Sequence, residues 1–364
     1  MSPIPTTMSG IYITQNGGVE VLDSKTDLPV PQLKPGEILV RNEYAGVNFI
    51  DTYFRTGLYK IPLPLIPGKE AAGTVAASNY PDFPVGSRVA YMGDGTYAEF
   101  TAVPAASAYL IPKGVSTEQA ASILIQGLTA LTLSLNVPIS SSPLPTNSKS
   151  TAKYVLIHAT SGGTGSLLAQ LLSQCPSKYT VIGTASTPVK AQASLQSGAV
   201  HHVINTSTES LPQRIKEITS NHGADIIFDG VGKATFDTDL EVIAQHGTLV
   251  PFGSASGTVP PLDLFRLSQK NVTLLRPAMP GYMTTQAERD FYTFKLFDLL
   301  KEGKVKNKIH KIYDLKDVAQ AHSDLEGRQT IGKVLLRIGG QEGGNGSSPT
   351  KDKTSSKWCP KSSN

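Results

Sequence analysis

The sequence is poor in cysteine: only Cys175 and Cys359 occur among its 364 residues. Two cysteines cannot form a framework of several disulfides, and such sparse usage is typical of a reducing compartment. A structural zinc ion usually takes four Cys or His ligands, which two distant cysteines and scattered histidines do not readily supply. We therefore expect a fold that forms without metal.

Long hydrophobic runs are also absent. No window approaches the roughly 18 apolar residues of a membrane-spanning helix, and residues 1–10 lack the charged and apolar regions of a secretory signal. The net charge of +4, from 33 basic and 29 acidic residues, is too small for this length to indicate by itself a nucleic-acid surface. These absences predict a soluble globular protein of the cytoplasm.

Apolar residues make up 39% of the chain, which is enough for a core, and the length predicts two domains. Residues 11–112 read as many short β-strands broken by Gly and Pro, among them 38–41, 73–76, 88–91 and 98–103. Ser116 and Gln119 then form the pattern of a capping box, which predicts a helix whose apolar positions recur as far as Leu135. Residues 138–151, rich in Ser and Pro, are expected to form an exposed loop.

From Lys153 the pattern changes to alternating strands and helices, which is typical of a doubly wound parallel sheet. The expected strands are 154–159, 180–183, 202–204, 225–228, 248–252 and 272–275, and the expected helices are 165–174, 188–196, 211–220 and 234–245. A last block holds a helix at 291–300, a strand at 310–313, a short helix from Asp317 and a strand at 333–338. Because the six-stranded sheet is already complete, this block is expected to rejoin the N-terminal unit. The chain beyond Gly339 has few aliphatic residues and is expected to be disordered.

A glycine-rich turn follows the first strand of the alternating region. Gly162, Gly163 and Gly165 allow a pyrophosphate to approach the backbone, and the helix that follows offers free N–H groups and a positive dipole end. The spacing is not a strict GxGxxG, and tight strand-to-helix packing also selects glycine. The position of the turn in the first of six alternating units favours a dinucleotide site.

The second strand indicates which dinucleotide binds. An NAD site usually places Asp or Glu roughly 20 residues after the glycines, where it bonds the ribose hydroxyls. Residues 183–190 contain no acid, whereas Ser186, Thr187 and Lys190 can hold a phosphate through charge-assisted hydrogen bonds. The pattern predicts NADP(H). Lys190 can also be a solvated side chain on the outer face of a helix, so the missing carboxylate is the firmer observation.

Several segments together resemble the zinc-independent quinone oxidoreductases, the zeta-crystallin-like branch of the medium-chain dehydrogenase/reductase superfamily. These segments are residues 45–59, 67–73, 126–130, the glycine turn, 229–232, 252–257 and 330–333. The resemblance implies an α/β protein with a GroES-like, mostly-β catalytic domain (1–133 and 278–339), an inserted Rossmann NADP(H)-binding domain (134–277) and a disordered tail (340–364). It also implies a homodimer through edge strands of the Rossmann domains.

The resemblance implies NADPH-dependent reduction of small quinones, by electron or hydride delivery from the nicotinamide without metal or flavin. In the zinc alcohol dehydrogenase branch a Cys and a His ligate the metal at places that Asn48 and Lys69 occupy in this sequence. Neither residue can replace a thiolate or an imidazole on zinc. The alcohol-oxidising branch is therefore disfavoured.

Position by position, the resemblance also implies the cofactor contacts. Asn48 and Tyr53 match the nicotinamide end, and Gln126 and Thr129 match the helix that approaches the cofactor. The pyrophosphate contacts are Gly162, Gly163, Thr164 and Gly165, and the adenosine-phosphate segment holds Gly183, Thr184, Ser186 and Lys190. Phe252, Gly253 and Ser254, with Arg276, Pro277 and Ala278, match strand ends that line the nicotinamide groove. Thr206 stands where some relatives have Tyr or His, so contact with the adenine end is expected to be weaker.

The candidate catalytic residues are Tyr53 and Tyr59, as donors to the oxyanion that develops on a quinone, with Asn48 and Asp51 ordering the local network. Tyr59 can equally be an aromatic residue that only packs, and Asp51 can serve a local turn. All seven histidines are interpreted as structural or surface residues, because none forms a convincing metal-spaced pair in the sequence. His158, beside the turn, is interpreted as a hydrogen-bonded histidine near the core.

Two other functions stay open. One is an NADPH-dependent reductase of the double bond in enones, enals or enoyl thioesters, since neighbouring branches of the superfamily use the same cofactor. The other is binding of AU-rich RNA in the nucleotide cleft, although no basic stripe with interleaved aromatic residues is present.

Overall fold

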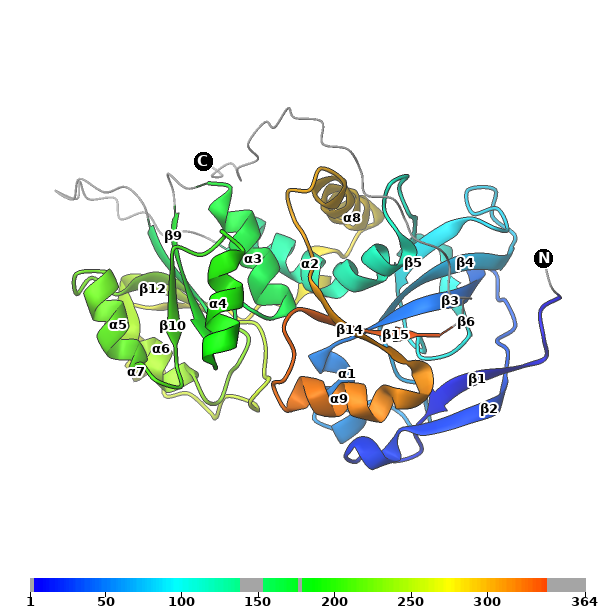
Figure 1. Ribbon diagram of the computed structural model, residues 1–364, viewed down its shortest axis with the longest axis horizontal. Helices are drawn as coiled ribbons and strands as arrows, with labels where there is room; N and C mark the ends of the chain where they lie inside the picture. The colour runs from blue at the N-terminus through cyan, green and yellow to red at the C-terminus, as the bar shows by residue number, and fades with distance from the viewer. Residues whose placement is uncertain (1–2, 138–152, 176–178, 339–364) are drawn as a thin grey trace. The chain divides into compact units, whose positions relative to one another are not determined.

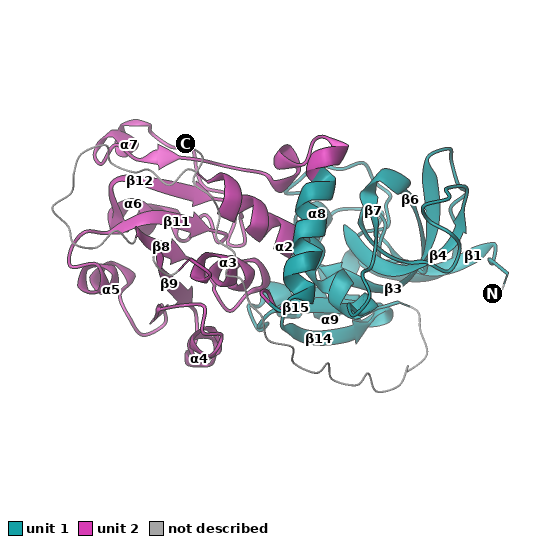
Figure 2. Cartoon of the chain, turned by 90° about the horizontal axis from the view of Figure 1, so that it is seen from above, with its two compact units in different colours: residues 1–125, 289–303, 307–353 teal, residues 126–288, 304–306, 354–364 magenta. Residues whose placement is uncertain are grey.

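The computed structural model describes residues 3–137, 153–175 and 179–338 (Figure 1). The predicted loop at 138–151 and the predicted tail at 340–364 lie outside these residues. The chain forms two compact units (Figure 2): unit 1 is the described part of residues 1–125, 289–303 and 307–353, and unit 2 that of 126–288, 304–306 and 354–364. The sequence places the domain boundaries at 133/134 and 277/278, and these stay predictions.

Unit 1 is built on a seven-stranded sheet. Its order is β14 (Ile309–Asp314), β15 (Lys333–Arg337), β3 (Glu37–Val47), β4 (Glu70–Ser78), β5 (Arg88–Met92) and β7 (Ala108–Leu110), with β6 (Phe100–Pro104) paired to β3. β1 (Thr7–Tyr12) and β2 (Asp23–Pro29) form a separate antiparallel pair. Leu335 in β15 lies opposite Gly46 in β3. The last block of the chain therefore completes the sheet of the N-terminal unit, as the sequence predicts.

The core of unit 1 contains aliphatic residues from neighbouring strands, including Ile38, Val40, Val75, Val89 and Val334. Each is at most 1% exposed, and burial of such a side chain contributes about 1.5–3 kcal/mol. The described residues include four short 3₁₀ helices: η1 (Val19–Val21), η2 (Ala105–Ser107), η3 (Met279–Tyr282) and η4 (Leu315–Asp317). The α-helices of unit 1 are α1 (Phe49–Thr56), most of α8 (Gln286–Lys301) and α9 (Val318–Glu326).

Helix α2 (Thr117–Asn136) contributes to both units. Its predicted capping box is present: Gln119 N donates to Ser116 Oγ and Ser116 N donates to Gln119 Oε1, both at 3.0 Å. These two bonds satisfy N–H groups at the helix start that the helix itself leaves unpaired.

Unit 2 contains a parallel sheet of six strands, as predicted. The order is β10 (His202–Asn205), β9 (Tyr179–Ala185), β8 (Lys153–Ile157), β11 (Ala224–Asp229), β12 (Ile243–Pro251) and β13 (Thr273–Leu274). The connecting helices are α3 (Gly163–Ser173), α4 (Pro188–Gln196), α5 (Leu211–Ile218), α6 (Phe236–Val242) and α7 (Phe265–Ser268). The strand order reverses between β8 and β11, and in such sheets ligands bind at that switch point, outside the carboxyl ends of the strands.

One predicted helix is shorter than expected. The sequence predicts a helix over 234–245, but α6 ends at Val242 and β12 begins at Ile243. Lys270 Nζ donates to the main-chain oxygens of Leu240, Glu241 and Ile243 at 2.6–3.2 Å. An ammonium group at this position satisfies the last carbonyl groups and ends the helix.

Two further observations concern expectations from composition. None of the described helices is both long enough and apolar enough to cross a bilayer. Cys175 is buried after α3. The other cysteine, Cys359, lies outside the described residues, so the expectation of a reducing compartment and the cytoplasmic location stay predictions.

Candidate functional site

The predicted pyrophosphate turn connects β8 to α3 in unit 2. Ala159 lies in the left-handed region at φ 54°, Gly162 is the N-cap of α3, and Gly162 N donates to Ala159 O at 2.9 Å. No side chain caps this helix start among the described residues. The N–H groups of the first turn of α3 are therefore available to a phosphate group.

Two glycines of the turn lie where a side chain would not fit. A Cβ atom at Gly163 would overlap with the side chain of Gln126, and one at Gly165 would lie 2.6 Å from Ala159 O. Tight packing therefore requires glycine at both positions. Gln126 Oε1 is buried and has no hydrogen-bond partner among the described residues. Gln126 Oε1 lies beside the uncapped start of α3, so it can accept a hydrogen bond from a donor group of a bound cofactor.

The predicted adenosine-phosphate segment runs from the end of β9 into α4. Thr187 is the N-cap of α4 and accepts from Lys190 N at 3.3 Å. Ser186 is half-buried, and the segment 183–190 contains no carboxylate. Gly183 and Thr184 are buried behind the turn, because a Cβ at Gly183 would overlap with Thr160 Oγ1. This part of the fold fits a 2′-phosphate, since the group that would repel a phosphate is missing.

The other predicted cofactor contacts also follow the carboxyl ends of parallel strands. Phe252 N donates to Asp229 O at 2.7 Å, and a Cβ at Gly253 would overlap with Gly230 O, so the segments after β11 and β12 approach each other closely. Ser254 is 7% exposed. Thr206 follows β10, and its main-chain N–H donates to Ala185 O at 2.9 Å. Arg276, Pro277 and Ala278 follow β13. Thr129 lies three residues after Gln126 on α2, one turn further along the helix.

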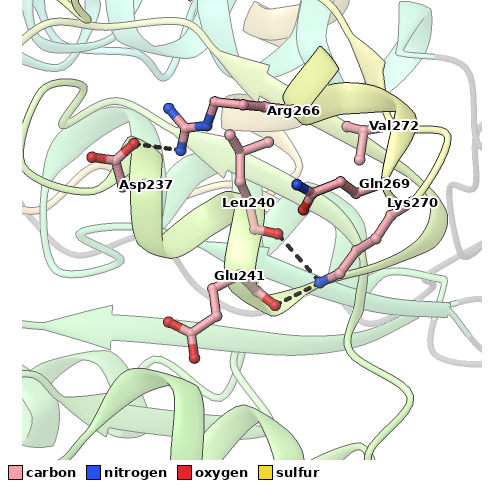
Figure 3. A pocket seen from close by; sticks show the side chains of 7 residues that line it. All are labelled: Asp237, Leu240, Glu241, Arg266, Gln269, Lys270 and Val272. Atoms are coloured by element: carbon pink, nitrogen blue, oxygen red, sulfur yellow. Dashed lines mark hydrogen bonds and ion pairs between the residues drawn. The ribbon is translucent and has the colours of Figure 1, made fainter. Parts of the chain in front are cut away.

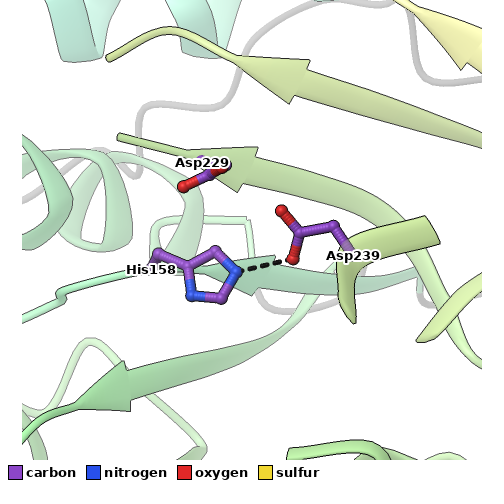
Figure 4. A group of neighbouring side chains, drawn as sticks. All are labelled: His158, Asp229 and Asp239. Atoms are coloured by element: carbon purple, nitrogen blue, oxygen red, sulfur yellow. Dashed lines mark hydrogen bonds and ion pairs between the residues drawn. The ribbon is translucent and has the colours of Figure 1, made fainter. Parts of the chain in front are cut away.

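A histidine behind the turn is paired with an acid, which agrees with the interpretation of His158 as a hydrogen-bonded histidine near the core. His158 Nε2 lies 2.7 Å from Asp239 Oδ1, and the ligand-type atoms of His158, Asp229 and Asp239 all lie within 4.8 Å of one another (Figure 4). All three residues are buried. The sequence separates His158 from Asp239 by 81 positions, so no local spacing could reveal the pair.

The predicted residues of unit 1 begin with Asn48 at the N-cap of α1. Asn48 N donates to Asp51 Oδ2 at 2.8 Å in a capping box. The Asn48 amide is engaged on both sides: Lys333 Nζ donates to its oxygen at 2.7 Å and its nitrogen donates to Glu70 Oε1 at 2.8 Å. At 4% exposure, Asn48 holds the start of α1 in place.

Two residues of this network were not singled out from the sequence. Lys333 and Glu70 form an ion pair, and each side chain is 0% exposed. Glu70 Oε2 also accepts from Ile125 N at 2.7 Å, and a Cβ at Gly46 would overlap with the Glu70 carboxylate. Both residues lie inside segments that carry the family resemblance. That is the signal by which they could have been found.

The same network continues from Asp51 to Arg55. Tyr97 Oη lies 2.9 Å from Asp51 Oδ2 and 3.5 Å from His322 Nε2, and Arg55 donates to His322 Nδ1 at 3.1 Å. Burial raises the pKa of Asp51 to about 7, although bonds from Asn48 and Tyr97 oppose the shift. Burial also lowers the pKa of His322 to about 3, with the Arg55 charge adding to the effect. Asp51 therefore makes the local bond at the start of α1 that the sequence suggests, and it also bonds Tyr97 in a buried, titratable network.

The predicted tyrosines lie in an aromatic group on and after α1. The ring centroids of Tyr53 and Tyr59 are 5.2 Å apart at 62°, and those of Phe54 and Tyr59 are 6.0 Å apart. Both tyrosines are half-buried. Lys69 Nζ lies 4.2 Å from the centre of the Phe54 ring and pairs with Asp94. The group presents polarisable faces and two phenolic hydroxyls.

A cavity of about 250 Å³ lies elsewhere on unit 2 (Figure 3). Asp237, Leu240, Glu241, Arg266, Gln269, Lys270 and Val272 line it. Lys270 and Val272 precede β13, so the cavity lies toward the amino end of this strand, away from the edge that carries the turn. Arg266 pairs with Asp237, and Lys270 is bound to main-chain oxygens. The cavity therefore offers no charge suited to a dinucleotide.

The chain is similar to known proteins over most of its length. Residues 34–113 match the alcohol dehydrogenase GroES-like domain family and residues 163–294 match the zinc-binding dehydrogenase family. A probable quinone oxidoreductase of Schizosaccharomyces pombe is 37% identical over 331 residues, 90% of this chain and 96% of the relative.

Two solved structures are also similar. A mycobacterial protein in complex with NADPH has a TM-score of 0.82 and 39% identity, covering 91% of this chain and 99% of that one. The Escherichia coli quinone oxidoreductase in complex with NADPH has a TM-score of 0.81 and 35% identity, covering 90% and 99%. The chain belongs to the quinone oxidoreductases of the medium-chain dehydrogenase/reductase superfamily.

Proposed function

We propose that this protein binds NADPH in unit 2 and uses it to reduce small quinones. The observation that carries the proposal is the uncapped start of α3 after the glycine turn, together with a β9–α4 segment that contains no carboxylate. Such a site favours a phosphorylated dinucleotide. The NADPH that is bound in two of the similar structures supports the same cofactor.

We assign the cofactor contacts by the group each would hold. The first turn of α3, at Gly162, Gly163, Thr164 and Gly165, holds the pyrophosphate, and Gln126 accepts a hydrogen bond next to it. Ser186, Thr187 and Lys190 hold the 2′-phosphate. Phe252, Gly253, Ser254 and the residues 276–278 flank the nicotinamide end. When bound, NADPH supplies the reducing equivalents, and the protein orients and shields them.

We assign the acceptor to the aromatic group of unit 1. A quinone is planar and readily reduced, so hydroxyl donors can stabilise the charge that develops on its oxygen without a metal ion. Tyr53 and Tyr59 are those donors, while Asn48 and Asp51 fix the start of α1 that carries Tyr53. Conversion of a quinone to a hydroquinone also consumes a proton beyond the one that NADPH brings, and Tyr53 and Tyr59 can pass it from water.

Neither metal nor flavin takes part in the proposed reaction. At the two places where the zinc branch has its Cys and His ligands, the Asn48 amide is fully engaged with Lys333 and Glu70, and the Lys69 ammonium is paired with Asp94. This donor set does not fit zinc, which prefers thiolate and imidazole ligands.

We also propose a homodimer that forms through β13, which is an edge strand of the sheet in unit 2. Leu264 and Phe265, shortly before it, are 72% and 82% exposed, and side chains of this kind are often covered in an assembly. Light scattering at micromolar concentration tests this, and a monomer would contradict it. RNA binding has no support of its own; salt-dependent RNA retention with and without NADPH would reveal competition for one cleft.

The activity is tested by following NADPH oxidation with ortho- and para-quinones, enones and enoyl thioesters at matched concentrations. We expect the highest kcat/KM with a quinone. A higher value with an enone or an enoyl thioester would instead establish the double-bond reductase. Parallel titration of NADPH and NADH against the protein alone separates cofactor choice from acceptor choice.

A further inference from the structure

Three segments of unit 2 that are distant in sequence meet at His158. This residue directly follows β8, and its two ring nitrogens contact different elements. Nε2 lies 2.7 Å from Asp239 Oδ1 on α6, and Nδ1 lies 3.1 Å from Thr184 Oγ1 on β9. The main-chain N–H of His158 donates to Phe228 O on β11 at 3.1 Å. His158 is 3% exposed, so these contacts are not exchanged for water.

Thr184 links the histidine to the pyrophosphate turn. Its Oγ1 accepts from Ala159 N at 3.1 Å while it contacts His158 Nδ1 at the same distance. Its main-chain oxygen accepts from Thr160 N, also at 3.1 Å. The first two residues of the turn are thus bonded to one threonine, and the histidine fixes the rotamer of that threonine.

The turn needs such support because Ala159 has a φ of 54°. An alanine pays a steric cost in the left-handed region, and a conformation of this kind persists only where the surroundings determine it. The carbonyl group of Ala159 accepts from Gly162 N and lies next to Gly165. The conformation of Ala159 therefore sets the position of the first turn of α3.

We interpret the three buried side chains as a hydrogen-bonded network and not as a metal site, on the evidence of Asp229. Asp229 Oδ1 accepts from Val231 N at 2.7 Å and from Gly232 N at 3.1 Å, and Asp229 Oδ2 accepts from Thr235 Oγ1 at 2.8 Å. Its oxygens are already used to hold the segment after β11. The cluster is consequently a hydrogen-bonded network.

We propose that His158 is a positioning residue of the cofactor site: held by Asp239, it fixes Thr184 and so keeps Ala159 and the first turn of α3 in the conformation that binds the NADPH pyrophosphate. This inference rests on the proposed function, because it concerns binding of the same cofactor. His158 touches no reacting atom; its effect is on cofactor affinity and on the order of the turn.

The charge state of the network supports this role. Among the described residues, the titratable groups that face His158 are Asp239 on α6 and Asp229 on β11; β9 contributes only the hydroxyl group of Thr184. Burial lowers the pKa of His158, but the charges of Asp239 and Asp229 outweigh burial and raise it overall. A protonated ring can donate from both nitrogens, to Asp239 and to Thr184.

The test compares variants by NADPH titration without acceptor and by amide hydrogen exchange without cofactor. His158→Gln removes the imidazole ring that contacts Asp239 through one nitrogen and Thr184 through the other. Thr184→Val removes the hydroxyl group and Thr184→Ser keeps it. His222→Gln is the matched control, because His222 pairs with Asp225 at 3.1 Å on the surface of the same unit. Ile227→Ala controls for a general loss of stability, since Ile227 is a core residue of β11.

We expect His158→Gln and Thr184→Val to weaken NADPH binding by about tenfold, the change expected when a binding loop loses one hydrogen bond. We also expect faster amide exchange at Ala159 and Thr160, with the KM for quinone unchanged. His222→Gln and Ile227→Ala should keep the wild-type affinity, and Thr184→Ser, which keeps the hydroxyl group, should bind NADPH more tightly than Thr184→Val. If His158→Gln does not fold, the comparison of Thr184→Val with Thr184→Ser decides whether the network positions the turn.

Other outcomes separate the two proposals. If the wild type binds NADPH and neither His158→Gln nor Thr184→Val changes affinity or exchange, His158 is not a positioning residue. If the wild type does not bind NADPH, the proposed function fails, and amide exchange alone decides whether His158 fixes the turn. If the purified wild type contains a stoichiometric metal ion and His158→Gln does not, the cluster is a metal site and the proposal is wrong.

Discussion

The hydroxyl group of Tyr97 donates to Asp51 Oδ2 over 2.9 Å, and both side chains are buried in unit 1. On its other side Tyr97 faces Nε2 of His322, whose Nδ1 accepts from Arg55. Because a guanidinium group only donates, the neutral His322 ring carries its proton on Nε2. Tyr97 therefore connects an acid whose pKa is raised to a histidine whose pKa is lowered.

The first prediction concerns Asp51→Asn. Burial raises the pKa of Asp51 from 3.8 to about 7, so the folded state holds this proton more tightly than the unfolded state. Its contribution to stability is present below pH 3.8 and is lost as the pH rises toward 7. Because the pKa of His322 is lowered to about 3, its contribution has the opposite sign and is lost as the pH falls below 6.5.

We therefore expect the stability difference, wild type minus Asp51→Asn, to fall between pH 4 and pH 8, on the order of a few kcal/mol. The groups that face Asp51 are Tyr97, Lys333 and Glu70, and all are kept in the variant. Urea unfolding across this range measures the difference. A difference that does not change with pH would show that Asp51 is ionised in the folded protein at acidic pH.

The second prediction concerns the pair of Lys333 and Glu70. Both side chains are fully buried, and removal of one partner leaves an uncompensated charge. We expect Lys333→Met to destabilise the protein by roughly 3–5 kcal/mol and Lys333→Met with Glu70→Gln to recover part of the loss. Denaturant unfolding of the double-mutant cycle measures the coupling. Lys25→Met is the control, because the Lys25 pair with Asp23 is exposed to solvent, and it should leave the stability nearly unchanged. Additive effects of the two changes would contradict the coupling.

The sequence was most informative where structure is local. The capping box at Ser116 and Gln119 lies within four residues, and the alternation of strands and helices follows hydrophobic periodicity, so both were predicted. The sequence does not predict the end of α6, because Lys270, which bonds the last carbonyl groups of this helix, follows them by 27–30 residues. Glu70 and Lys333, 263 residues apart, could not be paired by any local pattern. The glycine turn was predicted, whereas the histidine network behind it depends on three strands coming together.

The third prediction concerns Gly183→Ala. A Cβ atom at Gly183 would overlap with Thr160 Oγ1, and Thr160 belongs to the pyrophosphate turn. We expect the substitution to cost roughly 1–3 kcal/mol of stability and to weaken NADPH binding, because Thr160 must move. Gly281→Ala is the matched control, since a Cβ atom there has no neighbour within 4 Å. Thermal unfolding and NADPH titration measure the two effects. Equal behaviour of the two variants would show that Thr160 moves without consequence.

The fourth prediction concerns metal removal. The residues at the zinc-ligand places, Asn48 and Lys69, are engaged with other side chains. We expect kcat with a quinone to stay within twofold of its initial value after exhaustive chelation and dialysis, about 0.4 kcal/mol in the barrier. Elemental analysis of the dialysed protein provides the control. Loss of activity that returns on addition of zinc would contradict a reaction without metal.

The last prediction concerns the choice between NADPH and NADH. The segment from Gly183 to Lys190 carries hydroxyl groups and one ammonium group but no acid, and α4 begins in it with Thr187 as N-cap. Lys190→Glu places a carboxylate where a 2′-phosphate is expected, so repulsion replaces attraction for NADPH while NADH is little affected. We expect the ratio of kcat/KM for NADPH over NADH to fall at least tenfold, equivalent to about 1.4 kcal/mol. Lys216→Glu, on α5 of the same unit, controls for a general change of charge. If Lys190→Glu keeps the wild-type ratio, then the phosphate is bound elsewhere, and the hydroxyl groups of Ser186 and Thr187 alone do not explain a preference for NADPH.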